Sequence, residues 1–162
     1  MARALIVGCG CRGRELGSAL VDRGWVVRGT SRTERGARAI ADAGIELAVA
    51  DPDRIATVID ALEGVALIFW LMGSAAGEPE AVAALHGPRL TRLLEEIVDT
   101  PVRGFVYEIS PGLDPDHAAA AFAALRHAGE TWRIPFEVVD ADLGRPELWL
   151  EAMLAAAGEL VG

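Results

Sequence analysis

The segment IVGCGCRGRELG near the start of the chain combines two cysteines with closely spaced glycines. Two kinds of chemistry are compatible with it. Cys9 and Cys11 could form a thiol pair for metal binding or redox reactions, because a thiolate is both a nucleophile and a metal ligand. The glycines follow the pattern G-x-G-x-x-G, which lets a backbone turn approach a phosphate closely. The members of that pattern are Gly8, Gly10 and Gly13.

The thiol interpretation is the weaker of the two. A structural zinc site needs four ligands, and no further cysteine and no cluster of histidines accompanies the pair. We therefore predict no metal site, and we expect Cys9 and Cys11 to fill the turn as small, weakly polar side chains. Redox sensitivity remains a minor alternative, because the start of a helix favours the thiolate form.

The glycine pattern lies where a phosphate-binding turn has to lie. It follows the apolar run RALIVG and opens a segment with helical periodicity. In such a turn the first glycine permits the tight bend, the second lets the pyrophosphate of a dinucleotide approach, and the third packs helix against strand. Free N–H groups and the helix dipole attract the phosphates. We predict a dinucleotide site that includes the three glycines with Cys11 and Arg12; the alternative is a tight turn without a ligand.

The end of the second apolar run indicates which dinucleotide is bound. NAD sites carry a carboxylate about 20 residues beyond the glycines, which binds the ribose 2′-hydroxyl. Here the stretch GTSRTER offers hydroxyls and guanidiniums, and arginine can pair with a 2′-phosphate through two hydrogen bonds. We therefore predict NADP, with Arg12 as a second cation near the same phosphate, while Glu34 keeps NAD open as the alternative. The residues assigned to the 2′-phosphate are Thr30, Ser31, Arg32 and Arg35.

Six apolar runs alternate with helical segments, and these elements must position the side chains above. Short, continuous apolar runs are typical of strands that are buried on both faces. Helical crossovers between them indicate an α/β fold, a doubly wound parallel six-stranded Rossmann sheet in the order 3-2-1-4-5-6 with helices on both faces, in one domain over residues 1–162. The expected strands cover residues 3–8, 25–31, 45–51, 65–73, 104–110 and 136–142. The expected helices cover about 13–23, 34–44, 53–63, 79–99 (with a break allowed at 86–88), 116–130 and 146–160.

The composition excludes several functions. A net charge of −9 disfavours nonspecific binding to nucleic acid or to an anionic membrane surface. No apolar run approaches the roughly 20 residues that span a bilayer, and the N-terminus shows no cleavage site for a secretory signal, so we expect a cytoplasmic protein. All 15 basic residues are arginines, which excludes a lysine Schiff base and a Walker A phosphate site.

Several segments together resemble the short-chain dehydrogenase superfamily. They are ALIVGCGCRGRELGSALVDRGWVVRGTSR, VAD, GVALIFWLMG and GFVYEIS, and the resemblance extends over residues 3–145. It is strongest with the atypical and extended branches, the epimerase/dehydratase-like and NmrA-like NAD(P)-binding proteins. The resemblance implies that Asp51 contacts the adenine and that Ser110 is catalytic. It also implies a loop along the ribose and nicotinamide, formed by Leu71, Met72, Gly73 and Ser74.

The catalytic half of this resemblance is missing. The Tyr-x-x-x-Lys pair of the family should lie near residues 115–119, where neither residue occurs, and the single tyrosine, Tyr107, is expected to pack in the sheet. Extended members also carry a C-terminal substrate domain, whereas this chain stops one helix beyond the sixth strand, as a truncated member would. His117 is the remaining candidate proton donor, because histidine titrates near neutral pH.

Two functions are consistent with this pattern. The first is a small NADP-dependent oxidoreductase, in which the cofactor supplies a hydride to an unknown small molecule and Ser110 and His117 assist. The second is a non-catalytic NADP(H)-sensing regulatory protein of the NmrA-like type, which the missing Tyr-Lys pair favours. A homodimer is expected if Trp149 and the apolar stretch 148–154 cover a partner subunit.

Overall fold

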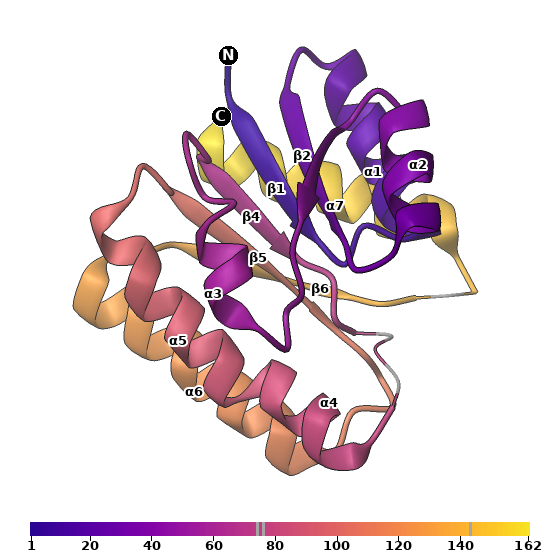
Figure 1. Ribbon diagram of the computed structural model, residues 1–162. Helices are drawn as coiled ribbons and strands as arrows, with labels where there is room; N and C mark the ends of the chain where they lie inside the picture. Colours follow the sequence, from indigo (N-terminus) through magenta and orange to yellow (C-terminus); the bar gives the residue numbers. More distant parts are fainter. Residues whose placement is uncertain (74, 76, 143) are drawn as a thin grey trace.

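Six parallel strands form one sheet at the centre of the fold (Figure 1). The computed structural model describes residues 1–73, 75, 77–142 and 144–162. The strand order, β3-β2-β1-β4-β5-β6, is the predicted one and confirms the doubly wound topology. The strands are β1 (Arg3–Val7), β2 (Val26–Ser31), β3 (Glu46–Val49), β4 (Leu67–Trp70), β5 (Gly104–Ile109) and β6 (Phe136–Asp140).

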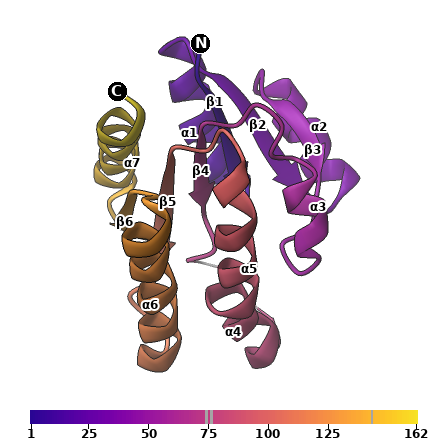
Figure 2. The same ribbon diagram turned by 90° about the vertical axis from the view of Figure 1, so that its left-hand side faces the viewer.

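Helices cover both faces of the sheet, as predicted (Figure 1, Figure 2). One face is covered by α1 (Cys11–Asp22), α2 (Glu34–Asp42) and α7 (Pro146–Val161). The other is covered by α3 (Ile55–Ile59), α4 (Pro79–His86), α5 (Pro88–Glu96) and α6 (Pro115–Trp132), with the short 3₁₀ turn η1 (Ile97–Asp99) after α5. None of the helices in the described ranges is long and apolar enough to cross a membrane.

Each central strand contributes to two apolar cores, because successive side chains of a strand point to opposite faces. On β1, Leu5 and Val7 pack on the face covered by α3 to α6, while Ala4 and Ile6 pack beneath α1 and α7. All four side chains are fully buried. This two-sided burial explains why residues 4–7 of β1 and all of β4 are uninterrupted apolar runs and do not alternate with polar residues.

Several elements are shorter than predicted. The helix expected over 53–63 is regular only over Ile55–Ile59 and then tightens into turns whose N–H groups bond three residues back, as in a 3₁₀ helix. The break allowed at 86–88 is confirmed: α4 ends at His86, and α5 begins with Pro88, which has no N–H to continue the preceding helix. Because the strands are parallel, the carboxyl ends of β1, β2 and β4 all lie at the same end of the sheet. The candidate site forms there.

Candidate functional site

Gly8 makes a bend that favours glycine. Its φ is +87°, in the left-handed region. A Cβ atom here would lie 2.5 Å from Met72 Cε and 2.7 Å from the carbonyl oxygen of Leu71. The Gly8 N–H donates to the hydroxyl of Thr30 at 3.3 Å. The bend therefore brings β1, β2 and the loop after β4 together at one point.

The next two glycines have opposite surroundings. A Cβ on Gly13 would lie 3.1 Å from the carbonyl oxygen of Gly8 and 3.4 Å from Ile6 Cγ2, so this glycine lets α1 pack closely on β1. Among the described residues, a Cβ on Gly10 would meet nothing within 4 Å, and its φ of −81° is open to any residue. Packing within the described fold thus does not require glycine at position 10, whereas a ligand resting on the backbone there would.

Helix α1 begins directly after Gly10, which is its N-cap residue and has no side chain to cap it. The N–H groups of a first helical turn have no partner inside the helix, and the positive end of the helix dipole lies at the same place. The N–H groups of Cys11 and Arg12 therefore need a partner from outside the helix. Water or an anionic group can fill this role, and the helix dipole favours the anion.

A cavity of about 420 Å³, here called the main cavity, opens beside this turn. Its walls come from the glycine turn, the loop after β2, the turn after β3, the loop after β4 and one side of α4. It lies outside the carboxyl ends of the strands next to β1, where ligands of doubly wound sheets bind. The predicted site residues that line it are Gly8, Gly10, Thr30, Ser31, Arg32, Leu71 and Met72.

Two hydroxyls that the sequence assigned to a phosphate also stabilise the turns. Thr30 is 4% exposed, and its hydroxyl accepts the Gly8 N–H. The Ser31 hydroxyl accepts the N–H of Thr33 at 3.2 Å and donates to the Thr33 carbonyl at 3.0 Å, which directs the chain into α2. Both residues lie in the wall of the main cavity. The Thr30 hydroxyl uses only its acceptor capacity in its contact with Gly8, so its O–H can still donate to a ligand. The assignment of both residues to a phosphate stays a prediction.

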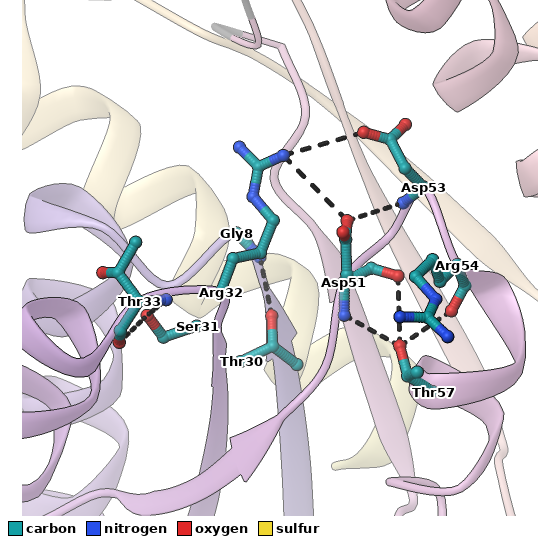
Figure 3. A network of polar contacts seen from close by, with 9 residues as sticks. All are labelled: Gly8, Thr30, Ser31, Arg32, Thr33, Asp51, Asp53, Arg54 and Thr57. Carbon is teal, nitrogen blue, oxygen red and sulfur yellow. Dashed lines mark hydrogen bonds and ion pairs between the residues drawn. The ribbon is translucent and has the colours of Figure 1, made fainter.

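Arg32 reaches across from the loop after β2 to the turn after β3 (Figure 3). Its Nη1 atom lies 3.6 Å from Asp53 Oδ2 and 4.0 Å from Asp51 Oδ1. Asp51 Oδ1 also accepts the N–H of Asp53 at 2.9 Å and so closes the turn that leads to α3. Arg32 and Asp53 both line the main cavity. A cation and a carboxylate thus share its rim.

The cations at the main cavity differ in part from the predicted ones. Arg14, near the start of α1, lines it together with Arg32. Its described lining does not include Arg12, Arg35 or Asp51, and Arg35 is exposed on α2. The prediction that Arg12 accompanies Arg32 at one phosphate is corrected, because Arg12 turns toward β5 and α7 instead.

Glu108, near the end of β5, joins four segments of the chain and is fully buried. Its Oε2 atom lies 3.3 Å from Arg12 Nη2 and accepts the indole N–H of Trp149 at 2.8 Å, while Oε1 accepts the Gly73 N–H at 3.1 Å. The Arg12 guanidinium also stacks over the Trp149 ring, 4.8 Å from its centroid. We call these four residues the Glu108 network. It connects the start of α1, the loop after β4, β5 and α7.

A smaller cavity of about 240 Å³ lies beside the Glu108 network and shares Gly8, Gly10 and Leu71 with the main cavity. The glycine turn is therefore the common wall of the two. Burial raises the pKa of Glu108 above its ordinary value, whereas the Arg12 charge and the donated hydrogen bonds lower it. Ser74, which the resemblance implies to lie along the ribose and nicotinamide, is outside the described residues.

The indole of Trp149 is not available to a partner subunit. It is 2% exposed and packs with Met153 and Ala156 between α7 and the sheet. The expectation that Trp149 covers a dimer contact is therefore wrong, although Leu148 on the same helix is 49% exposed. The homodimer itself stays a prediction.

The two candidate catalytic residues do not meet in either cavity. Ser110 is half-buried just after β5, and its hydroxyl accepts the N–H of Gly112 at 3.3 Å. His117 is half-buried in the first turn of α6, a helix that Asp114 caps through the N–H of Asp116. The described linings of both cavities include neither Ser110 nor His117. Their catalytic roles remain predictions.

Tyr107 is committed to the core, as predicted. It is fully buried, and its hydroxyl lies 2.5 Å from Nδ1 of His86, which is 1% exposed. Burial raises the pKa of Tyr107 and lowers that of His86, which favours the neutral form of both groups. The pair fastens α4 to β5 within the core, and the described linings of both cavities do not include Tyr107.

The structure separates the two cysteines. Cys9 is 5% exposed and fills the space beneath β2, where a Cβ on Gly29 would lie 2.7 Å from its Sγ atom. Burial raises the pKa of its thiol to about 11. Cys11 is exposed at the start of α1. Within the described ranges, no group of three or more His, Cys, Asp or Glu side chains is placed to hold a metal ion.

We expect one thiol to react in the folded protein and two after unfolding. A chromogenic thiol reagent should modify Cys11 quickly because it is exposed, and Cys9 only as fast as the fold opens. Cys11→Ser should abolish the fast phase, and Cys9→Ser should leave it unchanged. Rapid reaction of both thiols in the folded protein would contradict the packing of Cys9.

The sequence missed site residues whose side chains gave ambiguous signals. Asp53, in the stretch DPD, is expected at the start of the helix over 53–63. Carboxylates are common at helix starts, so its residue type does not indicate a binding site. The apolar residues of α4 that line the main cavity are indistinguishable in sequence from core residues. They are Ala81, Val82 and Leu85. The one available signal was that Arg12 and Arg14 are two residues apart. Residues at this spacing on a helix face different directions, so the two guanidiniums could not both point to the same side.

Comparison with known proteins gives a likeness in fold. No protein-family model matches the chain, and no curated protein matches it. One similar solved structure is a short-chain dehydrogenase/reductase superfamily protein from Agrobacterium tumefaciens with bound NAD; it has 19% identity and a TM-score of 0.68, and the match covers 85% of this chain and 48% of that one. A second is UDP-glucose 4-epimerase from Thermotoga maritima, with 14% identity, a TM-score of 0.70, and coverage of 85% of this chain and 54% of that one.

A third similar structure is UDP-glucuronic acid 4-epimerase from Bacillus cereus in complex with NAD, with 13% identity, a TM-score of 0.66, and coverage of 85% of this chain and 56% of that one. The chain spans about half the length of these solved structures. They are short-chain dehydrogenase and epimerase proteins, the group that the sequence resemblance indicates. At these identities the likeness concerns the fold, and it confirms a Rossmann sheet of the kind found in that superfamily.

Proposed function

We propose that the chain is one dinucleotide-binding domain that holds a nicotinamide adenine dinucleotide over its glycine turn. The observation that carries this proposal is the open space beside Gly10, at the start of α1 and at the edge of the main cavity. The N–H groups of Cys11 and Arg12 would hold the pyrophosphate. The main cavity, between Arg32 and Met72, would hold the adenosine half. Two of the solved structures to which the chain is similar contain NAD, which supports the proposal.

NADP(H) is the form that the rim of the main cavity favours. The end of β2 carries Ser31 and Arg32 where NAD sites carry a carboxylate, and Arg14 adds a second guanidinium. The ion pairs of Arg32 with Asp51 and Asp53 are solvent-exposed, and such pairs contribute about 0–1 kcal/mol each. A charge-assisted hydrogen bond to phosphate contributes about 1.5–3 kcal/mol. A 2′-phosphate can therefore displace the carboxylates and gain roughly tenfold in affinity.

The proposed activity is that of a small oxidoreductase. Bound NADPH would supply a hydride to a small molecule. The contribution of the chain is to hold the reactants: the glycine turn binds the phosphates, and the Glu108 network fixes the loop after β4 through the Gly73 N–H. Loops next to the carboxyl ends of β4 and β5 would orient the substrate.

A second function, an NADP(H) sensor without catalysis, is favoured by one specific observation. The described linings of both cavities leave out Ser110 and His117, the two candidate proton donors. Glu108, which lines the smaller cavity, has both carboxylate oxygens engaged by donors of the chain. Binding of the cofactor would then alter contacts of the protein without transfer of a hydride.

Isothermal titration calorimetry with NADPH, NADP⁺, NADH and NAD⁺ tests the binding function. NADPH and NADP⁺ should bind more tightly than the forms without the 2′-phosphate. Arg32→Ala should weaken NADPH binding by about tenfold, since it removes one charge-assisted contact, and should leave NADH binding unchanged. Absence of heat with all four dinucleotides would overturn the proposal.

Oxidation of NADPH distinguishes the two candidate functions. Its absorbance should be followed in the presence of quinones, flavins and aldehydes in turn. Turnover with any of them supports the oxidoreductase. Tight binding without turnover across the panel favours the sensor.

A further inference from the structure

Arg32, the cation that the proposed function assigns to the 2′-phosphate, is already held by carboxylates of the chain. Its Nη1 atom lies 3.6 Å from Asp53 Oδ2 and 4.0 Å from Asp51 Oδ1. Figure 3 draws both ion pairs as dashed lines. The Arg32 side chain is 61% exposed, so it is free to exchange partners with little loss. A phosphate that approaches Arg32 through Nη1 therefore competes with these carboxylates.

The two carboxylates are not equivalent. Asp51 Oδ1 accepts the N–H of Asp53, and the Asp51 backbone N–H donates to the Thr57 hydroxyl at 2.8 Å, so Asp51 is built into the turn before α3. Asp53 lines the main cavity, whereas the described lining does not include Asp51. The carboxylate of Asp53 also lies closer to Arg32 than that of Asp51 does. Asp53 is therefore the carboxylate that a ligand in this cavity meets.

A carboxylate at this position acts differently on the two forms of the cofactor. A 2′-phosphate carries negative charge, so it is repelled by Asp53 and has to displace it from Arg32. A ribose 2′-hydroxyl is a hydrogen-bond donor, and a carboxylate accepts from it. The same side chain thus opposes NADP(H) and accommodates NAD(H).

We propose that Asp53 limits the preference of this site for NADP(H) over NAD(H) by competing with the 2′-phosphate for Arg32. The inference rests on the proposed function and deepens it, because it names the residue that sets the balance between the two cofactors. Arg32 attracts the 2′-phosphate, and Asp53 weakens that attraction. The site therefore discriminates only in part between NADP(H) and NAD(H) and is not fully selective for either.

The test is calorimetric titration of Asp53→Asn with NADPH and NADH. The variant should bind NADPH about three- to tenfold more tightly, because a competing charge is removed while the shape is kept. Its affinity for NADH should stay the same or fall. Asp53→Asn should fold normally, since in the described structure the polar contact of its carboxylate is the exposed pair with Arg32.

Asp60→Asn is the matched control, because Asp60 is exposed at the end of α3 and its replacement changes the net charge by the same amount. A double-mutant cycle with Arg32→Ala adds a second readout: without Arg32, the gain from Asp53→Asn should largely disappear. An NADPH-to-NADH affinity ratio that does not rise in Asp53→Asn relative to Asp60→Asn would overturn the role of Asp53 while leaving dinucleotide binding intact. Failure of the unaltered protein to bind any dinucleotide would instead overturn the proposed function, and this inference with it.

Discussion

Glu108→Ala is expected to lower the free energy of unfolding by about 3–5 kcal/mol, because removal of one member of a buried ion pair leaves the other uncompensated. The Arg12 guanidinium would lose its carboxylate. The Trp149 indole N–H and the Gly73 N–H would lose their acceptor at the same time, and unsatisfied buried donors add to the cost. The free energy of unfolding of a domain of this size is about 5–15 kcal/mol in total, so the variant would be close to unfolding.

Urea denaturation followed by circular dichroism measures this loss. Glu108→Gln provides a milder variant: its carbonyl oxygen can still accept from Gly73, but its amide N–H₂ faces the donors of Arg12 and Trp149, and about 1–3 kcal/mol should be lost. The matched control is Glu151→Ala on the exposed side of α7, which should change stability by less than about 0.5 kcal/mol. Equal effects of Glu108→Ala and Glu151→Ala would show that the Glu108 network does not hold the fold together.

Gly10→Ala is expected to weaken dinucleotide binding by about tenfold or more in a protein that remains folded. The added methyl group would project into the open space beside the turn and keep a pyrophosphate away from the first N–H groups of α1. We expect at least a tenfold loss of NADPH affinity, about 1.4 kcal/mol or more. In the part of the chain that the structure describes, the methyl group meets nothing within 4 Å, so the free energy of unfolding should change by less than about 1 kcal/mol.

Gly8→Ala is the contrasting variant. It places a side chain at a φ of +87° and within 2.7 Å of the Leu71 carbonyl oxygen, and such backbone strain costs about 1–3 kcal/mol before the clash is counted. Its loss of binding would therefore come with a loss of stability. Calorimetry and thermal unfolding, measured on both variants, separate the two effects. Normal NADPH binding by Gly10→Ala would remove the observation on which the proposed function depends.

The sheet order and the glycine turn could be predicted because they depend on residues that are close in sequence. Each buried strand is its own apolar run, and right-handed crossovers leave few possible orders for six parallel strands. The motif around Gly8 and Gly13 is equally local: the two residues contact each other across a single bend. Local patterns of this kind are readable without knowledge of the packing.

The Glu108 network could not be predicted, because its members are far apart in sequence. Glu108 and Trp149 are separated by 41 residues, and their contact depends on how α7 packs against β5. The direction of Arg12 depended on where α1 begins. We expected the helix from about residue 13, which leaves Arg12 in a loop, whereas α1 begins at Cys11 and turns Arg12 and Arg14 to different sides. A shift of two residues in a helix start was enough to misplace a cation.

The surroundings of Trp149 are expected to make its fluorescence sensitive to the position of nearby charges. The ring stacks beneath the Arg12 guanidinium, donates to the Glu108 carboxylate and borders the smaller cavity next to Gly10. Indole emission responds in colour and intensity to charge in its immediate surroundings, and this ring contacts two charges of opposite sign. A movement of the glycine turn displaces one of them. We therefore expect the fluorescence of Trp149, one of four tryptophans in the chain, to respond to movement of the turn.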